Sequence, residues 1–325
     1  MKNIVLIGAG QLGSRHLQAL ALLNDAVKIY VVDPNYNSLQ TAKQRYEQIE
    51  GYTRHEIHFL ENYHEINETH IALAIVATNS EIRSLIISNL TQKFSIDFLL
   101  LEKFLFPRRE DYVQIGKLLT SFQIKTFVNC PRRMFSDYRA IKEAVALEET
   151  VRIEVIGNNW GLGCNGIHFI DLFQWLVGES IIKWHNELNP GFISSKRDGY
   201  VEFCGSLYGS SENNHKLSIT CYRYGVPNIS VRISSPSQRF IVSEGVKKIY
   251  AEEISNQKQD SNEFDYKPNF QSQLTNKVAD QLFTTGDCQL TPFAASVDAH
   301  LPFFETLLQH YNNYVEYKTD FCPIT

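Results

Sequence analysis

A short glycine-rich segment near the start of the chain constrains its fold more than any other feature. Residues 3–7 form an apolar run without alternation, as expected for a parallel strand covered on both faces. The run leads into Gly-Ala-Gly-Gln-Leu-Gly at residues 8–13, and leucines then recur at helical spacing over residues 12–23. This order is typical of a loop that holds a pyrophosphate, because the helix N-terminus offers N–H groups and a positive dipole end. The residues expected to bind a dinucleotide here are Gly8, Gly10, Gln11, Leu12 and Gly13.

Asp33 strengthens this interpretation. It lies 20 residues after Gly13, at the end of a second apolar run over residues 27–32. A carboxylate at that place binds the hydroxyls of the adenosine ribose and would repel the 2′-phosphate of NADP. No arginine follows Asp33 immediately, so the sequence favours NAD over NADP as the cofactor. The alternative is an incidental turn followed by a capping aspartate.

Strand-like and helix-like segments alternate over the first 125 residues. Such alternation predicts βαβ units, which right-handed crossovers close into a doubly wound parallel sheet. Strands beyond the first are expected at residues 27–32, 71–76, 98–101 and 124–128, and helices at residues 12–23, 38–49 and 80–90. We therefore expect a dinucleotide-binding Rossmann domain over residues 1–125.

The pattern changes after about residue 130. Helices are expected at residues 137–147 and 166–177, whereas strand-like runs separated by turns dominate between about 195 and 255. Clustered strands without intervening helices predict an antiparallel sheet. Residues 255–272, rich in Gln, Asn, Asp and Ser, are expected to form an exposed loop or a poorly ordered insertion. The predicted fold class is therefore α/β, with a second α/β domain over residues 126–325 that contains a large, mostly antiparallel sheet and a C-terminal helix at about 294–311.

Composition and charge exclude several classes of protein. The 325 residues include 43% hydrophobic and 21% charged side chains, which is typical of globular domains. A formal net charge of −5 argues against a nucleic-acid partner, which needs a basic surface. The first apolar run is too short for a signal peptide, and no apolar stretch of about 18 residues follows. The six cysteines form no CxxC pair, and His55, His58, His64 and His70 match no zinc-binding pattern, so we expect a cytoplasmic protein with no metal site and no membrane partner.

A lysine follows the fourth expected strand, in the order Glu102-Lys103-Phe104. Open parallel sheets bind their ligands beyond the carboxyl ends of the strands, so we expect Lys103 at the nicotinamide crevice. A lysine that is partly desolvated there can exchange a proton with a substrate hydroxyl during hydride transfer. The alternative is a solvated Glu-Lys pair on a loop.

His168 and Asp171 lie three residues apart, on one face of the helix expected over residues 166–177. A histidine can move protons near neutral pH or donate a hydrogen bond to a sugar hydroxyl. In the alternative interpretation, His168 is a packed side chain whose ring is held by Asp171.

The motifs of the chain, taken in order, resemble the glucose–fructose oxidoreductase / inositol dehydrogenase family (Gfo/Idh/MocA) over nearly its whole length. Each motif is unspecific alone, but their order and spacing are quite specific. They are the glycine loop followed by His16, Asp33-Pro34, Val76-Ala77-Thr78-Asn79, Glu102-Lys103, Asn129, Arg133, Trp160-Gly161, and Gly166-x-His168-x-x-Asp171 with Trp175-Leu176-x-Gly178.

The resemblance implies a Rossmann domain followed by an α/β domain whose sheet often serves as a dimer face. It also implies oxidation or reduction of a sugar, a polyol or a related hydroxyl compound. In that family pattern Lys103 is the principal acid/base group and Glu102 holds the nicotinamide ribose. The other implied contacts are those of Ala77, Thr78 and Asn79 with the cofactor and those of Arg133, Asn165, His168 and Asp171 with the substrate.

The chain departs from the family pattern at three positions. The usual Glu-Lys-Pro is Glu102-Lys103-Phe104, which keeps the lysine but removes a rigid, often cis-like turn element. The aspartate that sugar dehydrogenases of the family often carry four residues before the histidine is Cys164, so a Lys–Asp–His trio is incomplete. The usual proline after the third strand is Asn79.

The sequence therefore predicts an NAD-dependent oxidoreductase that transfers a hydride to or from a sugar-like or nucleotide-sugar hydroxyl or ketone. Lys103 and His168 are the expected catalytic residues, and a homo-oligomer is expected to form through the C-terminal sheet. Two alternatives remain open. One is a non-catalytic sensor that binds a dinucleotide and a ligand, which the cysteine at position 164 favours. The other is an enzyme of another class on the same fold, such as an NAD-dependent glycosidase or a dehydrogenase for an amino-acid-type substrate. In the latter case Arg132 and Arg133 could bind the substrate carboxylate.

Overall fold

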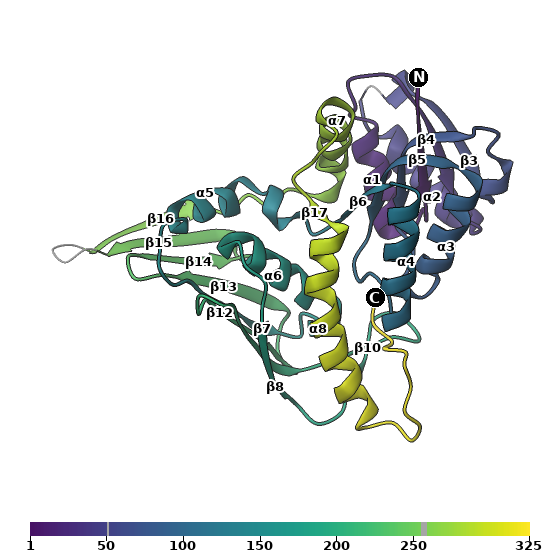
Figure 1. The fold of residues 1–325 in the computed structure, drawn as a ribbon. Helices are drawn as coiled ribbons and strands as arrows, with labels where there is room; N and C mark the ends of the chain where they lie inside the picture. The colour runs from purple at the N-terminus through teal and green to yellow at the C-terminus, as the bar shows by residue number, and fades with distance from the viewer. Residues whose placement is uncertain (51, 255–258) are drawn as a thin grey trace. The chain divides into compact units, whose positions relative to one another are not determined.

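The computed structural model describes residues 1–50, 52–254 and 259–325. The chain forms two compact units, the first with residues 1–129 and 269–294 and the second with residues 130–268 and 295–325 (Figure 1). The expected second domain includes residues 269–294, but this segment returns to the first unit. There α7 (Thr275–Thr285) packs on α1 (Gln11–Leu20), and β17 (Thr291–Pro292) pairs with β6 (Lys125–Val128).

The described residues of the first unit build a seven-stranded sheet in the order β17-β6-β5-β4-β1-β2-β3. Neighbouring strands are parallel except for β17, which pairs antiparallel with β6. The six parallel strands thus follow the order 3-2-1-4-5-6 of a dinucleotide-binding Rossmann sheet. The other strands are β1 (Lys2–Ile7), β2 (Val27–Val32), β3 (Glu56–Leu60), β4 (His70–Val76) and β5 (Ser95–Leu101), and the other helices are α2 (Tyr36–Glu47), α3 (Ser80–Lys93) and α4 (Arg109–Ser121).

The second unit is built on a sheet of eight described strands in the order β16-β15-β14-β13-β7-β12-β11-β8. Neighbouring strands are antiparallel except for the parallel pair β7 and β12. The strands are β7 (Arg152–Asn158), β8 (Lys183–Leu188), β11 (Gly205–Ser210), β12 (Lys216–Tyr222), β13 (Asn228–Ser234), β14 (Gln238–Ser243), β15 (Lys248–Ile254) and β16 (Gln259–Asp265). The predicted α/β class, with a parallel sheet followed by a mostly antiparallel one, is confirmed.

One face of this second sheet is covered by helices. Figure 1 shows α5 (Ser136–Val145) and α6 (Leu162–Val177) lying over it, and α5 contacts β14 while α6 contacts β12. In β7 the buried residues Ile153 and Val155 alternate with exposed ones, so every second side chain points toward the helices. The helix α8 (Phe293–Asn312) ends the regular structure and matches the expected C-terminal helix closely.

Part of the segment expected as an exposed loop is a strand instead. Residues 259–265 form β16, which pairs along its whole length with β15, while residues 255–258 lie outside the described residues. The prediction for residues 259–265 was wrong because an edge strand can be highly polar: only one of its sides needs a hydrogen-bonding partner, and both faces can meet solvent. No helix among the described residues is both long and apolar enough to cross a membrane.

Candidate active site

The glycine loop joins β1 to α1 in the first unit. Gly8 has a positive φ of 94°, and a Cβ added to it would lie 3.0 Å from the backbone of Ala77. A Cβ added to Gly13 would lie only 1.8 Å from the carbonyl oxygen of Gly8, so strand and helix can approach each other only with glycine there. A Cβ on Gly10, in contrast, would meet no atom of the described chain within 4 Å. The space beside Gly10 is therefore open on the side where a ligand would approach.

The N-terminus of α1 suits an anion. Gly10 is the N-cap residue, and no side chain among the described residues caps this helix end. The N–H groups of a first helical turn have no partner within the helix, so phosphate oxygens can accept them. Beside the loop, the Arg45 guanidinium donates to Gln11 Oε1 at 2.9 Å and to Ser14 Oγ at 2.6 Å. These bonds tie α2 to the helix that the loop opens.

Asp33 ties the glycine loop to the end of β2. Its Oδ2 accepts the Ala9 N–H at 2.7 Å, and its Oδ1 accepts the Asn35 N–H at 2.8 Å. The Gly8 N–H donates to the Val32 carbonyl at 2.8 Å alongside. The carboxylate thus lies at the carboxyl edge of the sheet, as the sequence predicts, and it also shapes the loop.

A cavity of about 450 Å³ opens at this edge. Gly8, Gly10, Asp33, Ala77, Thr78 and Asn79 line it, so the structure brings most of the expected cofactor-binding residues to one place. Its other lining side chains were not among the expected cofactor contacts, and several are apolar or aromatic: Ile7, Val32, Pro34, Tyr63, Ile82 and Ile86. A mostly apolar hollow beside a carboxylate has the lining that an adenine ring next to a ribose would need. An anion-accepting helix end, an open space at Gly10 and this hollow together fit a dinucleotide.

Lys103 follows β5 at the carboxyl edge of the same sheet. In the described segment from Leu99 to Pro107, every residue except Lys103 is buried. The buried Arg83 guanidinium of α3 donates to the Leu105 carbonyl at 3.0 Å and also to the carbonyls of Phe104 and Thr78. Lys103 therefore projects from a turn whose backbone is held on its far side by an arginine. The peptide bond between Lys103 and Phe104 is cis, although no proline follows the lysine.

Glu102, on the near side of Lys103, is only 3% exposed. Its Oε1 accepts hydrogen bonds from His16 Nε2 at 2.8 Å and from Asn129 Nδ2 at 2.5 Å. The sequence resemblance assigns this carboxylate to the nicotinamide ribose. In the structure it binds two side chains of its own unit, and neither pairing was expected from the sequence.

The expected substrate residues lie in the second unit. Arg133 and Asp171 bind one another through two hydrogen bonds of 2.8 and 3.2 Å, and Asp171 is 2% exposed. His168 is partly exposed on α6, and Asn165 donates its side-chain amide to the Trp160 carbonyl at 2.7 Å. Arg133 thus balances the charge of the buried Asp171 carboxylate. Because Asp171 belongs to α6 and Arg133 precedes α5, their two hydrogen bonds also hold these two segments together.

A second cavity, of about 220 Å³, lies within the second unit at the start of α6. It is lined by Trp160, Cys164, Asn165, Glu202, Cys204 and Cys221, among others. Burial, followed by the neighbouring Cys221 thiol, raises the pKa of Cys204 to about 11, so this thiol is neutral at physiological pH. Cys164 and Asn165, which the sequence singled out, thus line the same cavity.

Glu202 brings a carboxylate to this cavity next to Cys164. Its Oε2 accepts the Gly163 N–H at 2.7 Å, and its Oε1 accepts the Cys164 N–H at 3.2 Å. The residue belongs to β10 (Val201–Glu202), which pairs with β9 (Ile193–Ser194). No local motif in the sequence marks Glu202, because it reaches α6 from a strand almost 40 residues further along the chain.

We expect Glu202→Ala to destabilise the protein by about 1–2 kcal/mol, because two N–H groups at the start of α6 lose their acceptor. Glu202→Gln keeps one acceptor oxygen, so we expect it to lose less stability than Glu202→Ala. Urea unfolding of both variants measures the difference. An unchanged unfolding midpoint in Glu202→Ala would contradict the capping role.

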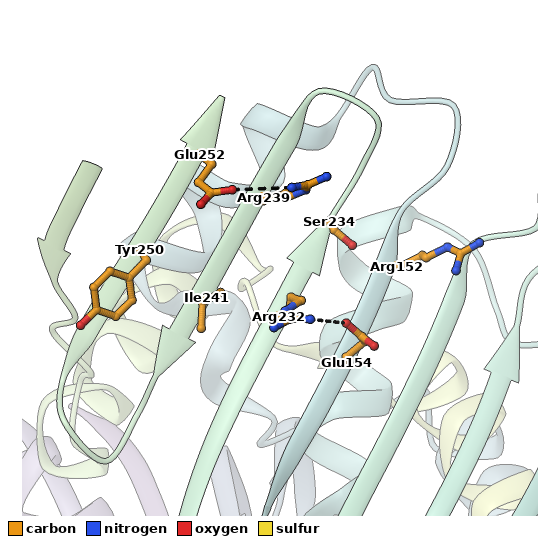
Figure 2. A pocket seen from close by; sticks show the side chains of 8 residues that line it. All are labelled: Arg152, Glu154, Arg232, Ser234, Arg239, Ile241, Tyr250 and Glu252. Carbon is orange, nitrogen blue, oxygen red and sulfur yellow. Dashed lines mark hydrogen bonds and ion pairs between the residues drawn. The ribbon is translucent and has the colours of Figure 1, made fainter. Parts of the chain in front are cut away.

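The uncovered face of the eight-stranded sheet carries a shallow hollow of about 500 Å³ (Figure 2). Charges of both signs line it: Arg232 lies 3.5 Å from Glu154, and Arg239 lies 3.8 Å from Glu252. Large apolar side chains on the same face are exposed to solvent, among them Ile156, Tyr222 and Tyr250. In the portion of the chain that the structure describes, no group of three or more His, Cys, Asp or Glu side chains is placed to hold a metal ion.

Known proteins resemble this chain in structure and not in sequence. No family model matches the chain, and no curated protein matches it significantly. UDP-N-acetylglucosamine 3-dehydrogenase GnnA from Acidithiobacillus ferrooxidans superposes with a TM-score of 0.72 at 11% identity, over 93% of this chain and 95% of that one. Levoglucosan dehydrogenase in complex with NADH gives 0.69 at 14% identity, over 96% and 97% of the two chains. The transcriptional regulator Gal80p from Kluyveromyces lactis gives 0.68 at 14% identity, over 96% and 89%. The chain therefore has the two-part fold of these proteins, a Rossmann domain followed by an α/β domain with a mostly antiparallel sheet.

Proposed function

We propose that the protein is an NAD-dependent oxidoreductase that acts on the hydroxyl or carbonyl group of a sugar-like compound. The observation that carries this proposal is the presentation of Lys103. A partly exposed lysine projects from an otherwise buried turn, at the carboxyl edge of a sheet whose first loop suits a dinucleotide. The fold shared with two named sugar-type dehydrogenases supports the same conclusion.

The proposed roles are those that the sequence resemblance implies for these side chains. Bound NAD would supply the hydride acceptor, held by the glycine loop, Asp33 and the residues after β4. Lys103 Nζ takes the proton of the substrate hydroxyl during oxidation and returns it during reduction. His168 assists this proton transfer, and Asn165 contacts the substrate. The Arg133–Asp171 pair keeps α6, and with it His168, in place.

The reaction is tested with purified protein, NAD and a panel of sugars, polyols and nucleotide sugars, by following the near-ultraviolet absorbance of the reduced nicotinamide. Turnover of at least one panel compound is expected, and the reverse reaction is assayed with NADH and the matching ketones. Failure to bind NADH, measured by calorimetry, would overturn the proposal as a whole. Binding of NADH without any turnover across the panel would overturn its catalytic part.

A non-catalytic sensor is the second candidate. Cys164 stands where sugar dehydrogenases of the resembled family often carry aspartate, and the fold is shared with a transcriptional regulator. A sensor of this kind would bind NADH and a sugar-type ligand but would not exchange a hydride between them. The amino-acid dehydrogenase is less favoured, because its expected carboxylate-binding arginines are engaged within the chain. Arg132 binds Glu244 at 2.9 and 3.0 Å, and Arg133 binds Asp171.

Asp33→Asn should lower the affinity for NADH by about tenfold and reduce the preference for NADH over NADPH. The carboxylate is expected to bind the ribose hydroxyls, and a charged hydrogen bond contributes about 1.5–3 kcal/mol. Titration of both cofactors against the variant measures the change. Asp97→Asn, which removes an exposed carboxylate paired with His70, is the control. Equal cofactor preference in Asp33→Asn and the native chain would remove Asp33 from cofactor selection.

We also propose that two copies associate through the uncovered face of the eight-stranded sheet. A two-fold interface brings the same surface of both copies together, and this face offers apolar side chains and charges of both signs. Ile156→Lys should therefore halve the mass measured by light scattering. Val113→Lys, at an equally exposed position on α4, should leave the mass unchanged. A native chain that is already monomeric at micromolar concentration would contradict the interface.

A further inference from the structure

Five polar side chains of the first unit form a closed ring of hydrogen bonds, which we call the polar ring. Four of them are buried, His16, Glu102, Asn129 and Thr275, and the fifth, Gln271, is partly exposed. His16 Nε2 lies 2.8 Å from Glu102 Oε1, and His16 Nδ1 lies 2.8 Å from Thr275 Oγ1. Asn129 Nδ2 donates to both Glu102 Oε1, at 2.5 Å, and Gln271 Oε1, at 2.8 Å. Gln271 Nε2 donates to Thr275 Oγ1 at 2.9 Å, which closes the ring.

One arrangement of protons satisfies every bond of the polar ring. While Thr275 Oγ1 accepts the Gln271 Nε2 hydrogen, its own hydroxyl proton can be donated to His16 Nδ1. The histidine proton then resides on Nε2 and is donated to Glu102 Oε1. Each member determines the donor or acceptor role of the next, so the loss of one hydroxyl changes the whole ring.

The polar ring joins segments that are far apart in the sequence. His16 belongs to α1, which the glycine loop opens, and Glu102 and Asn129 follow β5 and β6. Gln271 and Thr275 lie in the segment that returns to the first unit, in a short 3₁₀ helix (Gln271–Gln273) and at the start of α7. His16 and Thr275 are 0% exposed. At these two residues solvent therefore cannot replace the lost partner of a broken bond without entering the core.

Lys103 lies between two buried anchors. The residue before it, Glu102, is held by the polar ring, and the residue after it, Phe104, has its carbonyl held by Arg83. Both anchors act on the backbone from which the lysine side chain projects, and both are almost fully buried. A displacement of a catalytic group by about 1 Å can reduce turnover by about 100-fold, so the rigidity of this backbone bears directly on proton transfer.

We propose that the polar ring is a positioning device that orients Lys103, with Thr275 and His16 as positioning residues that act through Glu102. The inference rests on the proposed role of Lys103 as the acid/base group. It assigns to residues 269–294 a function in the first unit: their hydroxyl and amide complete the ring that holds Glu102. The ring members are not expected to contact the substrate.

Thr275→Val tests the proposal, because it removes one hydroxyl and keeps the shape of the side chain. We expect kcat to fall about tenfold while the KM for NAD stays within twofold. Thr275→Ser keeps the hydroxyl and should regain most of the lost turnover. In a Lys103→Ala background, Thr275→Val should cause no further loss, because the residue that it orients is gone. Thr91→Val is the matched control: this buried hydroxyl of α3 donates within its own helix, to the Ser88 carbonyl.

A second measurement does not depend on turnover. The rate at which an activated acetyl ester modifies the Lys103 amine, followed by peptide mass spectrometry in the folded full-length chain, should change at least threefold in Thr275→Val. It should return toward the native value in Thr275→Ser and stay unchanged in Thr91→Val. An unchanged rate in Thr275→Val would overturn the polar ring as a positioning device, whether or not the protein is an enzyme. A changed rate in a chain without turnover would support the ring and overturn only the proposed function.

Discussion

Lys103→Ala is expected to lower turnover by about two to four orders of magnitude while the affinity for NADH stays within a few-fold. The large loss follows from the chemistry: without the amine, the substrate hydroxyl has to transfer its proton to water or to a poorly placed group. The small change in affinity follows from the geometry, because Lys103 does not line the cavity at the glycine loop. That cavity is lined by residues at the ends of β1 and β2, after β3 and β4, and in α3.

The variant is compared with Lys117→Ala, which removes an exposed lysine from α4. Steady-state kinetics on the best substrate of the panel gives kcat and KM for both, and calorimetry gives the Kd for NADH. Lys103→Arg retains the charge but has a pKa too high for proton exchange, so it should be almost as inactive as Lys103→Ala. Native turnover in Lys103→Ala would remove this residue from the mechanism.

Gly10→Ala and Gly13→Ala should impair different properties, although the two glycines belong to one loop: the first the affinity for NADH, the second the stability of the fold. Gly13→Ala should destabilise the protein by about 3 kcal/mol, because its Cβ would lie 1.8 Å from the Gly8 carbonyl oxygen and the backbone would have to shift. Gly10 has a φ of −64°, which alanine adopts easily, and an added Cβ meets no described protein atom within 4 Å. Its substitution should therefore change stability by less than about 1 kcal/mol.

The affinity for NADH should separate the two variants further. In Gly10→Ala the new methyl group enters the open space beside the loop, which the proposed pyrophosphate site needs. We therefore expect the Kd to rise about 100-fold, or about 2.7 kcal/mol. Thermal unfolding and calorimetry on the same samples measure both effects. A Gly10→Ala variant that is stable and binds NADH normally would show that the ligand does not approach this loop.

The alternation of strands and helices in the first 125 residues could be predicted because parallel strands buried on both faces are continuously apolar. β2 lies where expected, and β1 and β4 extend the expected runs by a residue. Elements with weaker patterns were not predicted. β7 alternates Ile153 and Val155 with charged neighbours, and α4 carries buried residues only at Tyr112, Ile115 and Leu119. In such half-buried elements the hydrophobic signal is diluted by the exposed side chains.

In the candidate site, too, some features could be predicted from local sequence patterns and others could not. Glycine spacing and the end of a strand locate Gly8, Asp33 and Lys103, because these positions depend on local geometry and on the carboxyl edge of a parallel sheet. The pairing of Arg133 with Asp171, and the capping of α6 by Glu202, join residues 38 and 39 positions apart. No local pattern reports such pairs, so two residues expected to face the substrate prove to bind each other.

The glycine loop, the order of the parallel strands and the placing of Lys103 at a strand end are properties of short segments, and they can be inferred from residue order alone. The return of residues 269–294 to the first unit, and with it the polar ring that includes Glu102, depends on the packing of the whole chain. His16 and Thr275 are 259 positions apart and meet only because α7 packs on α1. Buried polar groups must find partners wherever the fold brings them, so their pairing is decided by tertiary packing and not by the local pattern of hydrophobic and polar residues.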